Sequence, residues 1–184
     1  MRTFLAFEVD EEVMKQVLAM TTHFKSIDRS VRWVKPENTH VTIHFFGEIE
    51  ERNIKRIGSV IKDVCTGIEP IPVEIRGISA FPSLERARVI WYGVHDDGRL
   101  NTVYRRVHDG LEGADIDEKL ETRPYTPHLT AGRVKARMNP KLIEEIRRCE
   151  ESAFGSFNIN ELVLFKSTLT GSGPLYDKLD RFHL

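Results

Sequence analysis

Two histidines in this chain are each followed by a threonine two positions later: His40 by Thr42, and His128 by Thr130. Both pairs lie where polar and apolar residues alternate with a period of two, which is typical of β-strands. Because successive side chains of a strand point to opposite faces, each imidazole shares a face with its hydroxyl. A motif this short also arises by chance, but both copies follow a turn signal and one lies in each half of the chain.

A pair of histidines indicates acid–base chemistry, because histidine exchanges its proton near neutral pH. One neutral and one protonated imidazole can act as base and acid on opposite sides of one phosphorus atom. Phosphoryl transfer then needs little beyond positioning and donors for the non-bridging oxygens, which Thr42 and Thr130 can supply. Arg133, three residues after Thr130, adds a charged donor for a phosphate.

The strict alternation of the first strand predicts that His44 lies on the same face as His40, about 13 Å away by strand rise. We therefore expect His44 to be structural or peripheral. A metal site is the main chemical alternative and requires three or more histidine, cysteine or carboxylate ligands. No acidic residue lies beside either motif at a spacing that would supply them. We expect neither a metal ion nor another cofactor.

The composition describes a globular protein without a membrane span. The chain has 184 residues, of which 40% are hydrophobic and 30% charged, and no run of about 18 apolar residues. The first eight residues predict a strand, not a signal peptide, and we expect a cytoplasmic protein. The net charge of −1 does not favour nonspecific nucleic-acid binding, so a nucleic-acid substrate would need a local basic site.

Two finer features of the composition carry weaker information. A single glutamine beside many glutamate, lysine and arginine residues is a bias found in proteins from hot environments. Cys65 and Cys149 are expected to be free thiols in two separate helices, with a disulfide or a metal pair as the alternative.

Helix and strand signals predict a mixed fold in which strand pairs alternate with single helices. Strands are expected over 2–8, 30–34, 39–47, 73–78, 88–95, 127–133, 157–169 and 175–184, with helices over 10–25, 50–67, 98–111 and 139–149. The strand over 30–34 is expected to pair with the His40 strand, and most of 112–127 is expected to be loop. This order predicts an α+β class with mainly antiparallel sheets and helices outside, in one domain over 1–184.

The motifs resemble those of the two-histidine (2H) phosphoesterase superfamily, and more closely its branch of RNA 2′,3′-cyclic phosphodiesterases and 2′-5′ RNA ligases. The likeness begins with segments 39–43, 46–47 and 127–131. It extends over nearly the whole chain, through segments 2–7, 31–34, 81–82, 88–93, 162–167 and 173–176. Each segment alone is weak, and together they are specific.

The resemblance implies two pseudo-symmetric lobes, each an antiparallel sheet with helices on its outer face, around a central cleft. It implies metal- and ATP-independent opening of RNA 2′,3′-cyclic phosphate ends to a 2′-phosphate, with reversible 2′-5′ ligation of tRNA halves. His40 would be the proton donor and His128 the proton acceptor, while Thr42 and Thr130 hold the phosphate. Separately from the resemblance, we expect a monomer.

Two alternatives to this enzyme stay open, namely a noncatalytic module that binds RNA ends and a metal-dependent phosphoesterase. Four aromatic residues are candidates for stacking a base: Phe45, Phe46, Tyr125 and Trp33. For the two phenylalanines, packing in the core is the expectation.

Overall fold

The computed structural model describes residues 1–114, 124–171 and 173–184. The strands are β1 (Arg2–Phe7), β2 (Val31–Trp33), β3 (Val41–Glu48), β4 (Ile71–Phe81), β5 (Val89–His95), β6 (His128–Val134), β7 (Ala153–Ile159), β8 (Glu161–Thr170) and β9 (Gly173–His183). The α-helices are α1 (Glu11–Ile27), α2 (Glu51–Cys65), α3 (Arg99–Gly113) and α4 (Pro140–Arg148), and a 3₁₀ turn spans Pro36–Asn38.

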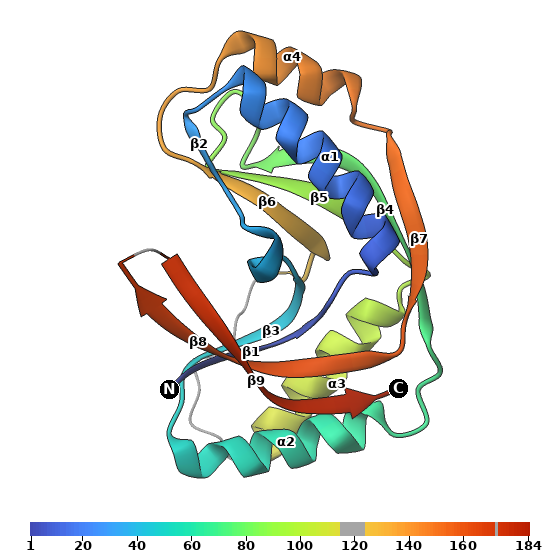
Figure 1. The fold of residues 1–184 in the computed structure, drawn as a ribbon. Helices are drawn as coiled ribbons and strands as arrows, with labels where there is room; N and C mark the ends of the chain where they lie inside the picture. The colour runs from blue at the N-terminus through green and yellow to red at the C-terminus, as the bar shows by residue number, and fades with distance from the viewer. Residues whose placement is uncertain (115–123, 172) are drawn as a thin grey trace.

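All the strands belong to one antiparallel sheet that curls strongly along its length (Figure 1). Its order is β7-β4-β5-β6-β3-β1-β8-β9, with β2 added beside β6. Helices α1 and α4 cover the outer face of one half of the sheet, and α2 and α3 cover the other half. The α+β class with antiparallel strands and outer helices is thereby confirmed. The two lobes share one continuous sheet, whose halves join where β3 meets β6.

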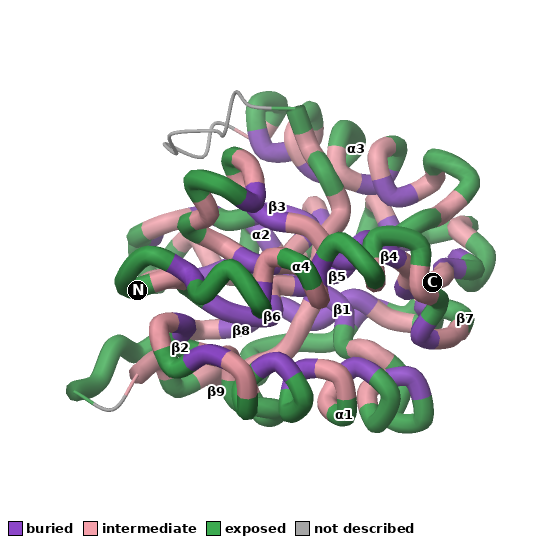
Figure 2. The backbone as a smooth tube through the Cα atoms, turned by 90° about the horizontal axis from the view of Figure 1, so that it is seen from above, coloured by how far each residue is buried: buried purple, intermediate pink, exposed green. Residues whose placement is uncertain are grey.

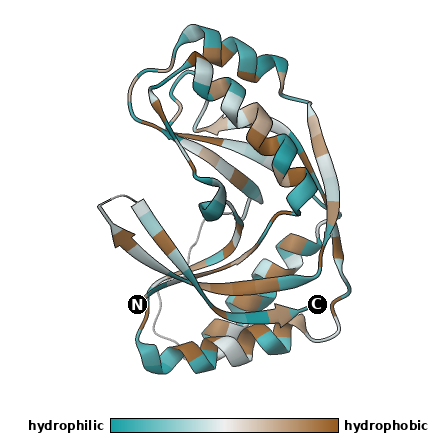
Figure 3. Cartoon of the chain, in the orientation of Figure 1, coloured by the Kyte–Doolittle hydropathy of each residue, from teal (hydrophilic) through white to brown (hydrophobic). Residues whose placement is uncertain are grey.

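The core lies between the sheet and the helices, as the helical spacing of apolar residues predicts (Figure 3). Each helix buries the apolar residues of one face: Val13, Val17 and Phe24 in α1, Ile57, Ile61 and Cys65 in α2, Leu100, Val103, Val107 and Leu111 in α3, and Leu142 and Ile146 in α4. Buried backbone runs mainly through the central strands and the inward sides of the helices (Figure 2).

Two helices begin at the caps that the sequence predicts. The Asp10 carboxylate accepts a hydrogen bond from the backbone N–H of Glu12 at 2.9 Å, and the Asn139 side chain accepts one from Lys141 at 2.9 Å. Cys65 is buried and Cys149 is partly buried, and both are free thiols. Among the described helices, none is both long enough and apolar enough to cross a membrane.

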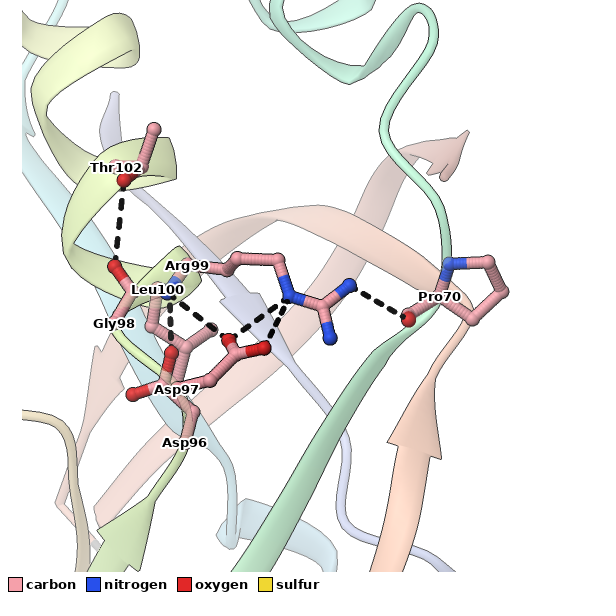
Figure 4. A network of polar contacts seen from close by, with 7 residues as sticks. All are labelled: Pro70, Asp96, Asp97, Gly98, Arg99, Leu100 and Thr102. Atoms are coloured by element: carbon pink, nitrogen blue, oxygen red, sulfur yellow. Dashed lines mark hydrogen bonds and ion pairs between the residues drawn. The ribbon is translucent and has the colours of Figure 1, made fainter.

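The start of α3 is held by an acidic turn (Figure 4). The Asp96 carboxylate accepts a hydrogen bond from the backbone N–H of Leu100 at 2.8 Å, and Asp97 pairs with Arg99 at 2.9 Å. The Arg99 guanidinium also donates to the carbonyl of Pro70, just before β4, at 3.3 Å. Gly98 lies between Asp97 and Arg99, and its φ of +93° permits the left-handed turn there. This contact ties α3, in one lobe, to β4, which belongs to the other.

Two of the expected strand assignments were wrong. The strand over 30–34 pairs with β6 and not with the His40 strand, because the 3₁₀ turn sends the chain away from a hairpin. The expected strand over 157–169 is two strands, β7 and β8, which pair with β4 and β1 on opposite halves of the sheet. Asn160 and Glu161 interrupt the alternation at the bend, but no glycine or proline stands there, so the sequence marks the break only weakly.

Candidate active site

One backbone pairing brings the two His-x-Thr motifs together. Val41 of β3 lies opposite Leu129 of β6 in an antiparallel pair, and both side chains are fully buried. Continuing this register by one residue in each direction places His40 opposite Thr130 and Thr42 opposite His128. Opposite residues of neighbouring strands have Cβ atoms roughly 5 Å apart, and diagonal ones are roughly 7–8 Å apart.

The four polar side chains therefore share the face of the sheet opposite to the buried Val41 and Leu129, which we call the site face. The histidines occupy one diagonal of this four-residue arrangement and the threonines occupy the other. A pseudo-two-fold axis passes between Val41 and Leu129, so each imidazole has a hydroxyl beside it on its own strand and another across the pair.

His40 lies among aromatic rings on the site face. The ring of Phe4, in β1, stacks on it with centroids 4.6 Å apart, and Tyr176, in β9, meets it edge-on at 5.1 Å. Burial lowers the pKa of His40 to about 4, against weaker upward effects of a hydrogen bond to the Asn38 carbonyl and of the Glu8 charge. The imidazole is therefore neutral at pH 7 in the unliganded protein.

His128 is oriented by a carbonyl just before its strand and by one ring from each of β4 and β5. Its Nδ1 lies 2.8 Å from the carbonyl oxygen of Thr126, and Phe81 and Trp91 meet the ring edge-on at 5.2 and 6.4 Å. A carbonyl oxygen can only accept a hydrogen bond, so Nδ1 carries the proton and Nε2 of the neutral ring keeps a lone pair.

Each imidazole thus interacts with the backbone carbonyl two residues earlier: His128 donates a hydrogen bond to Thr126, and the Asn38 backbone raises the pKa of His40. The Thr42 and Thr130 side chains are partly buried beside them. Within the described ranges, no protein group forms a hydrogen bond with either hydroxyl. Both hydroxyls can therefore donate to a bound anion.

A β-bulge in β3 overturns the expected position of His44. Thr42 pairs with Ala6 and His44 with Leu5, so Ile43 is an extra residue that shifts the alternation by one. His44 is 1% exposed and packs in the core between Phe46 and Tyr104. The expectation that His44 shares the face of His40 was therefore wrong. Its buried position is consistent with the structural role that we expected for it.

The same bulge brings Phe45 to the site face, where its side chain is 40% exposed, whereas Phe46 is buried. The guanidinium carbon of Arg2 lies 4.8 Å from the centroid of the Phe45 ring. The expectation of core packing therefore holds for Phe46 and was wrong for Phe45.

A bulge in β6 changes the face on which Arg133 lies. In the pairing of β6 with β5, Thr130 lies opposite Trp91 and Gly132 opposite Ile90, so Ala131 is an extra residue. Ala131 and Gly132 are both buried, and Arg133 is exposed again. The positive charges of Arg133 and Arg2 partly offset the upward effect of burial on the pKa of Tyr176, which places both guanidinium groups near that ring. Arg133 therefore lies on the same face as Thr130.

The other two stacking candidates pack away from this group. Trp33 stacks on the buried Phe24, with ring centroids 6.1 Å apart, and Tyr125 stacks on Tyr104 of α3 at 4.8 Å. Sequence reasoning missed Phe4 and Tyr176 as neighbours of His40. Phe4 lies in the strand expected over 2–8, but only the pairing of β1 with β3 shows which residues its side chain contacts.

Metal-type ligands gather elsewhere in the described part of the chain. Side-chain ligand atoms of His108, Asp109 and Glu112 lie within 4.8 Å of one another on α3. Asp109 and Glu112 are exposed, and the group includes neither His40 nor His128.

The curled sheet and its two facing His-x-Thr strands define a two-histidine phosphoesterase. The chain belongs to the family described as LigT like Phosphoesterase, whose model matches residues 7–91 and 95–176.

Named relatives match this chain along nearly their whole length, and a solved structure shares its fold. The chain is 37% identical to an RNA 2′,3′-cyclic phosphodiesterase of Methanothermobacter thermautotrophicus over 184 residues, covering 100% of this chain and 98% of the relative. It is 34% identical to a Thermotoga maritima protein of the same name, covering 97% and 93%. A crystal structure of a Thermus thermophilus protein superposes with a TM-score of 0.87 at 25% identity, covering 100% and 98%.

A solved structure of Escherichia coli LigT complexed with 3′-AMP has the same fold. Its TM-score is 0.78 at 20% identity, with 100% of this chain and 97% of that chain covered.

Proposed function

We propose that this protein is an RNA 2′,3′-cyclic phosphodiesterase that opens the cyclic phosphate at an RNA end and leaves a 2′-phosphate. The observation that carries the proposal is the Val41–Leu129 pairing, which gathers two imidazoles and two hydroxyls on one face. Relatives that bear this name over their full length support the choice of substrate.

In the proposed reaction, a water oxygen attacks phosphorus in line with the bond to the ribose O3′. His128 accepts a proton from the water through Nε2, the atom left with a lone pair by the Thr126 contact. As the P–O3′ bond breaks, His40 donates a proton to O3′. The product carries a 2′-phosphate and a free 3′-hydroxyl, and the two imidazoles have exchanged their protonation states.

The donor role of His40 requires that substrate binding change its protonation. The pKa of about 4 leaves the free imidazole neutral at pH 7. A phosphodiester anion placed beside it favours the charged form and raises the pKa. Substrate binding is therefore coupled to proton uptake, which limits the charged form of His40 to complexes that hold the anion.

The remaining groups stabilise negative charge on the non-bridging oxygens. Thr42 and Thr130 donate hydrogen bonds to the phosphate, and Arg133 supplies a charged donor. Phe45, exposed beside the Thr42 and His128 side chains, is the best-placed ring for stacking the terminal base. This set of groups performs the reaction without a metal ion or ATP.

Ligation joins an RNA 5′-hydroxyl to a 2′,3′-cyclic phosphate through a 2′-5′ bond, with the 5′-hydroxyl in place of water as the nucleophile. His128 accepts the proton of the 5′-hydroxyl, and His40 donates a proton to O3′ as the P–O3′ bond breaks. The two histidines exchange roles only in the reverse of this step, in which the 3′-hydroxyl cleaves the 2′-5′ bond. Halves of tRNA are the proposed substrates for ligation, and we propose that a cytoplasmic monomer carries out both hydrolysis and ligation.

The test is incubation with adenosine 2′,3′-cyclic phosphate in excess chelator, followed by chromatographic separation of 2′-AMP from 3′-AMP. We expect 2′-AMP from the native protein and losses of about 10²- to 10⁴-fold in kcat for His40→Ala and His128→Ala. His183→Ala is the matched control, since that imidazole is 82% exposed near the chain end.

The alternatives give different results. Loss of native activity in chelator would indicate a metal-dependent phosphoesterase. Binding of cyclic-phosphate RNA without turnover, unchanged in both alanine variants, would indicate a noncatalytic module for RNA ends.

A further inference from the structure

Two arginines face each other beside the proposed catalytic group. Arg32 of β2 lies directly opposite Arg133 of β6, and both side chains are exposed. Their neighbours Val31 and Val134 form the next pair and pack with the core, so the two guanidinium groups project from the site face.

The two guanidinium charges on neighbouring strands repel each other. Like charges directly opposite each other on neighbouring strands are destabilising. No carboxylate among the described residues forms an ion pair with Arg133. The chain as a whole has a net charge of −1, so two adjacent cations on this face are a local feature. Such a pair is complementary to one phosphate, which each guanidinium can contact through two N–H donors.

The tip of the β8–β9 hairpin approaches the same pair. Pro174, in this hairpin, accepts a hydrogen bond from the side chain of Asn38 at 3.1 Å. A Cβ atom built on Gly173 would come within 3.1 Å of Nη2 of Arg32, and this glycine has φ +128°. The backbone conformation at this position favours glycine, and a side chain there would crowd the Arg32 guanidinium.

The pair lies at one end of the catalytic group and Phe45 lies at the other. Along the paired strands the order is Phe45, then the Thr42–His128 pair, then the His40–Thr130 pair, then Arg133. By strand rise, Arg133 is roughly 7–10 Å from Thr130 along the backbone. The arginine pair therefore lies to one side of the proposed position of the reacting phosphate, on the side away from Phe45.

We propose that Arg32 and Arg133 together bind the internucleotide phosphate next to the cyclic phosphate, so that the protein selects RNA ends over cyclic mononucleotides. The inference rests on the proposed function, because it assumes that a cyclic phosphate occupies the space between His40 and His128. Arg133, which also serves the reacting phosphate, would contact the neighbouring phosphate as well, and Arg32 gains a role in substrate selection.

The test compares three substrates with the intact chain. Adenosine 2′,3′-cyclic phosphate has no second phosphate. The dinucleotide ApA with a 2′,3′-cyclic end has one, and its methylphosphonate analogue has a neutral linkage of nearly the same shape. We expect kcat/KM for the dinucleotide to exceed that for the methylphosphonate analogue about tenfold. Arg32→Gln should abolish most of this difference, and Arg32→Lys should retain part of it.

Arg52→Gln is the matched control. It removes the same charge from α2, where the side chain is 78% exposed on the outer layer, and should keep the native preference. The salt dependence gives a second readout, because each lost phosphate contact lowers the slope of log affinity against log salt by about 0.7 for a single strand. Equal kcat/KM for the charged and neutral linkages, or an equal loss on all substrates in Arg32→Gln, would overturn the proposal.

A binding measurement separates this proposal from the proposed function. ApA ending in a 2′-phosphate is titrated calorimetrically against the native protein and Arg32→Gln. Suppose that no substrate is turned over, but Arg32→Gln weakens binding of the charged dinucleotide and not of its methylphosphonate analogue. The phosphate site then stands and the catalytic proposal fails. If all substrates are turned over without discrimination of the linkage, the catalytic proposal stands and this site is rejected.

Discussion

Phe4 lies face to face with His40, its ring centroid 4.6 Å from that of the imidazole and its side chain 3% exposed. An apolar ring in this position removes water from one side of the histidine and disfavours its charged form. The proton affinity of the proposed catalytic acid therefore depends in part on β1, a strand that contributes no proposed catalytic group.

The first prediction concerns the titration of His40. The folded-state pKa of about 4 is below the ordinary value of 6.5, so the unfolded chain binds more protons between these values. His40 therefore leaves stability unchanged above pH 6.5 and lowers it as the pH falls toward 4, by at most about 3 kcal/mol. Proton NMR should give a midpoint below 5 for His40 and a higher one in the presence of 2′-AMP.

The variant His40→Asn isolates this contribution. The difference in the free energy of unfolding between native protein and variant should depend on pH between 6.5 and 4 and be constant above that range. A midpoint for His40 near 6.5 would show that the stacked ring does not shield it from water.

The second prediction uses the two hydroxyls. Thr42→Val and Thr130→Val keep the branched shape and remove the donor, so each should lower kcat by about 10- to 100-fold, as expected for a hydrogen bond to a charged group. Because the two sites are related by pseudo-symmetry, the losses should be similar. Thr168→Val is the control, as this threonine is exposed in β8. Single-turnover kinetics give the measurement, and a change in KM alone would argue against a role in the transition state.

The third prediction contrasts two adjacent residues of β3. Phe45→Ala should raise KM for a dinucleotide about 5- to 100-fold, because base stacking contributes about 1–3 kcal/mol, and should leave the melting temperature nearly unchanged. His44→Ala should do the opposite, lowering the free energy of unfolding by about 2–4 kcal/mol as a buried truncation and preserving KM. Thermal melts and steady-state kinetics are measured on both variants. If Phe45→Ala lowered the stability and His44→Ala raised KM, the bulge in β3 would not lie at Ile43.

The fourth prediction assigns Asn38 as a positioning residue for His40. Its backbone raises the pKa of the imidazole, and its side chain donates a hydrogen bond to the carbonyl of Pro174, so the β8–β9 hairpin fixes the turn that precedes His40. Asn38→Ala should lower kcat about 5- to 20-fold, as expected when about 1 kcal/mol or more of hydrogen-bond energy is lost.

The pH profile distinguishes positioning from general destabilisation. Because the hydrogen bond to Asn38 raises the pKa of His40, its loosening should shift the limb that reports His40 to lower pH. Thr39→Val is the control, since the Thr39 hydroxyl donates to Lys35 at 3.0 Å within the same turn. An unshifted profile in Asn38→Ala would reduce the role of Asn38 to stability.

The fifth prediction concerns acid stability. Asp28 is 8% exposed and accepts hydrogen bonds from the backbone N–H groups of Asn139 at 2.6 Å and Ser30 at 2.7 Å. Burial alone would raise its pKa, but these donors outweigh that effect and lower it. The stabilisation is present above the ordinary pKa and is lost as the pH falls through the depressed one. Asp28→Ala should cost about 1–3 kcal/mol at pH 7 and less below pH 3, measured by urea unfolding.

The sequence alone determined the elements and the chemical types at the site. Helix periodicity and caps predicted all four described α-helices, since these signals are local: a cap or an apolar spacing acts within one or two turns. The paired His-x-Thr strands were likewise visible, because each imidazole and its hydroxyl are separated by a single strand repeat.

Only the tertiary structure decided which residues meet. The position of Ile43 as an extra residue depends on how β3 pairs with β1, and nothing in β3 itself marks it. That one residue moved His44 into the core and Phe45 to the site face. The neighbours Phe4 and Tyr176, and the apposition of Arg32 with Arg133, likewise follow from strand partners that lie far apart in the chain. Strand pairing is a nonlocal choice made by the packing of the whole sheet, so alternation along one strand cannot specify it.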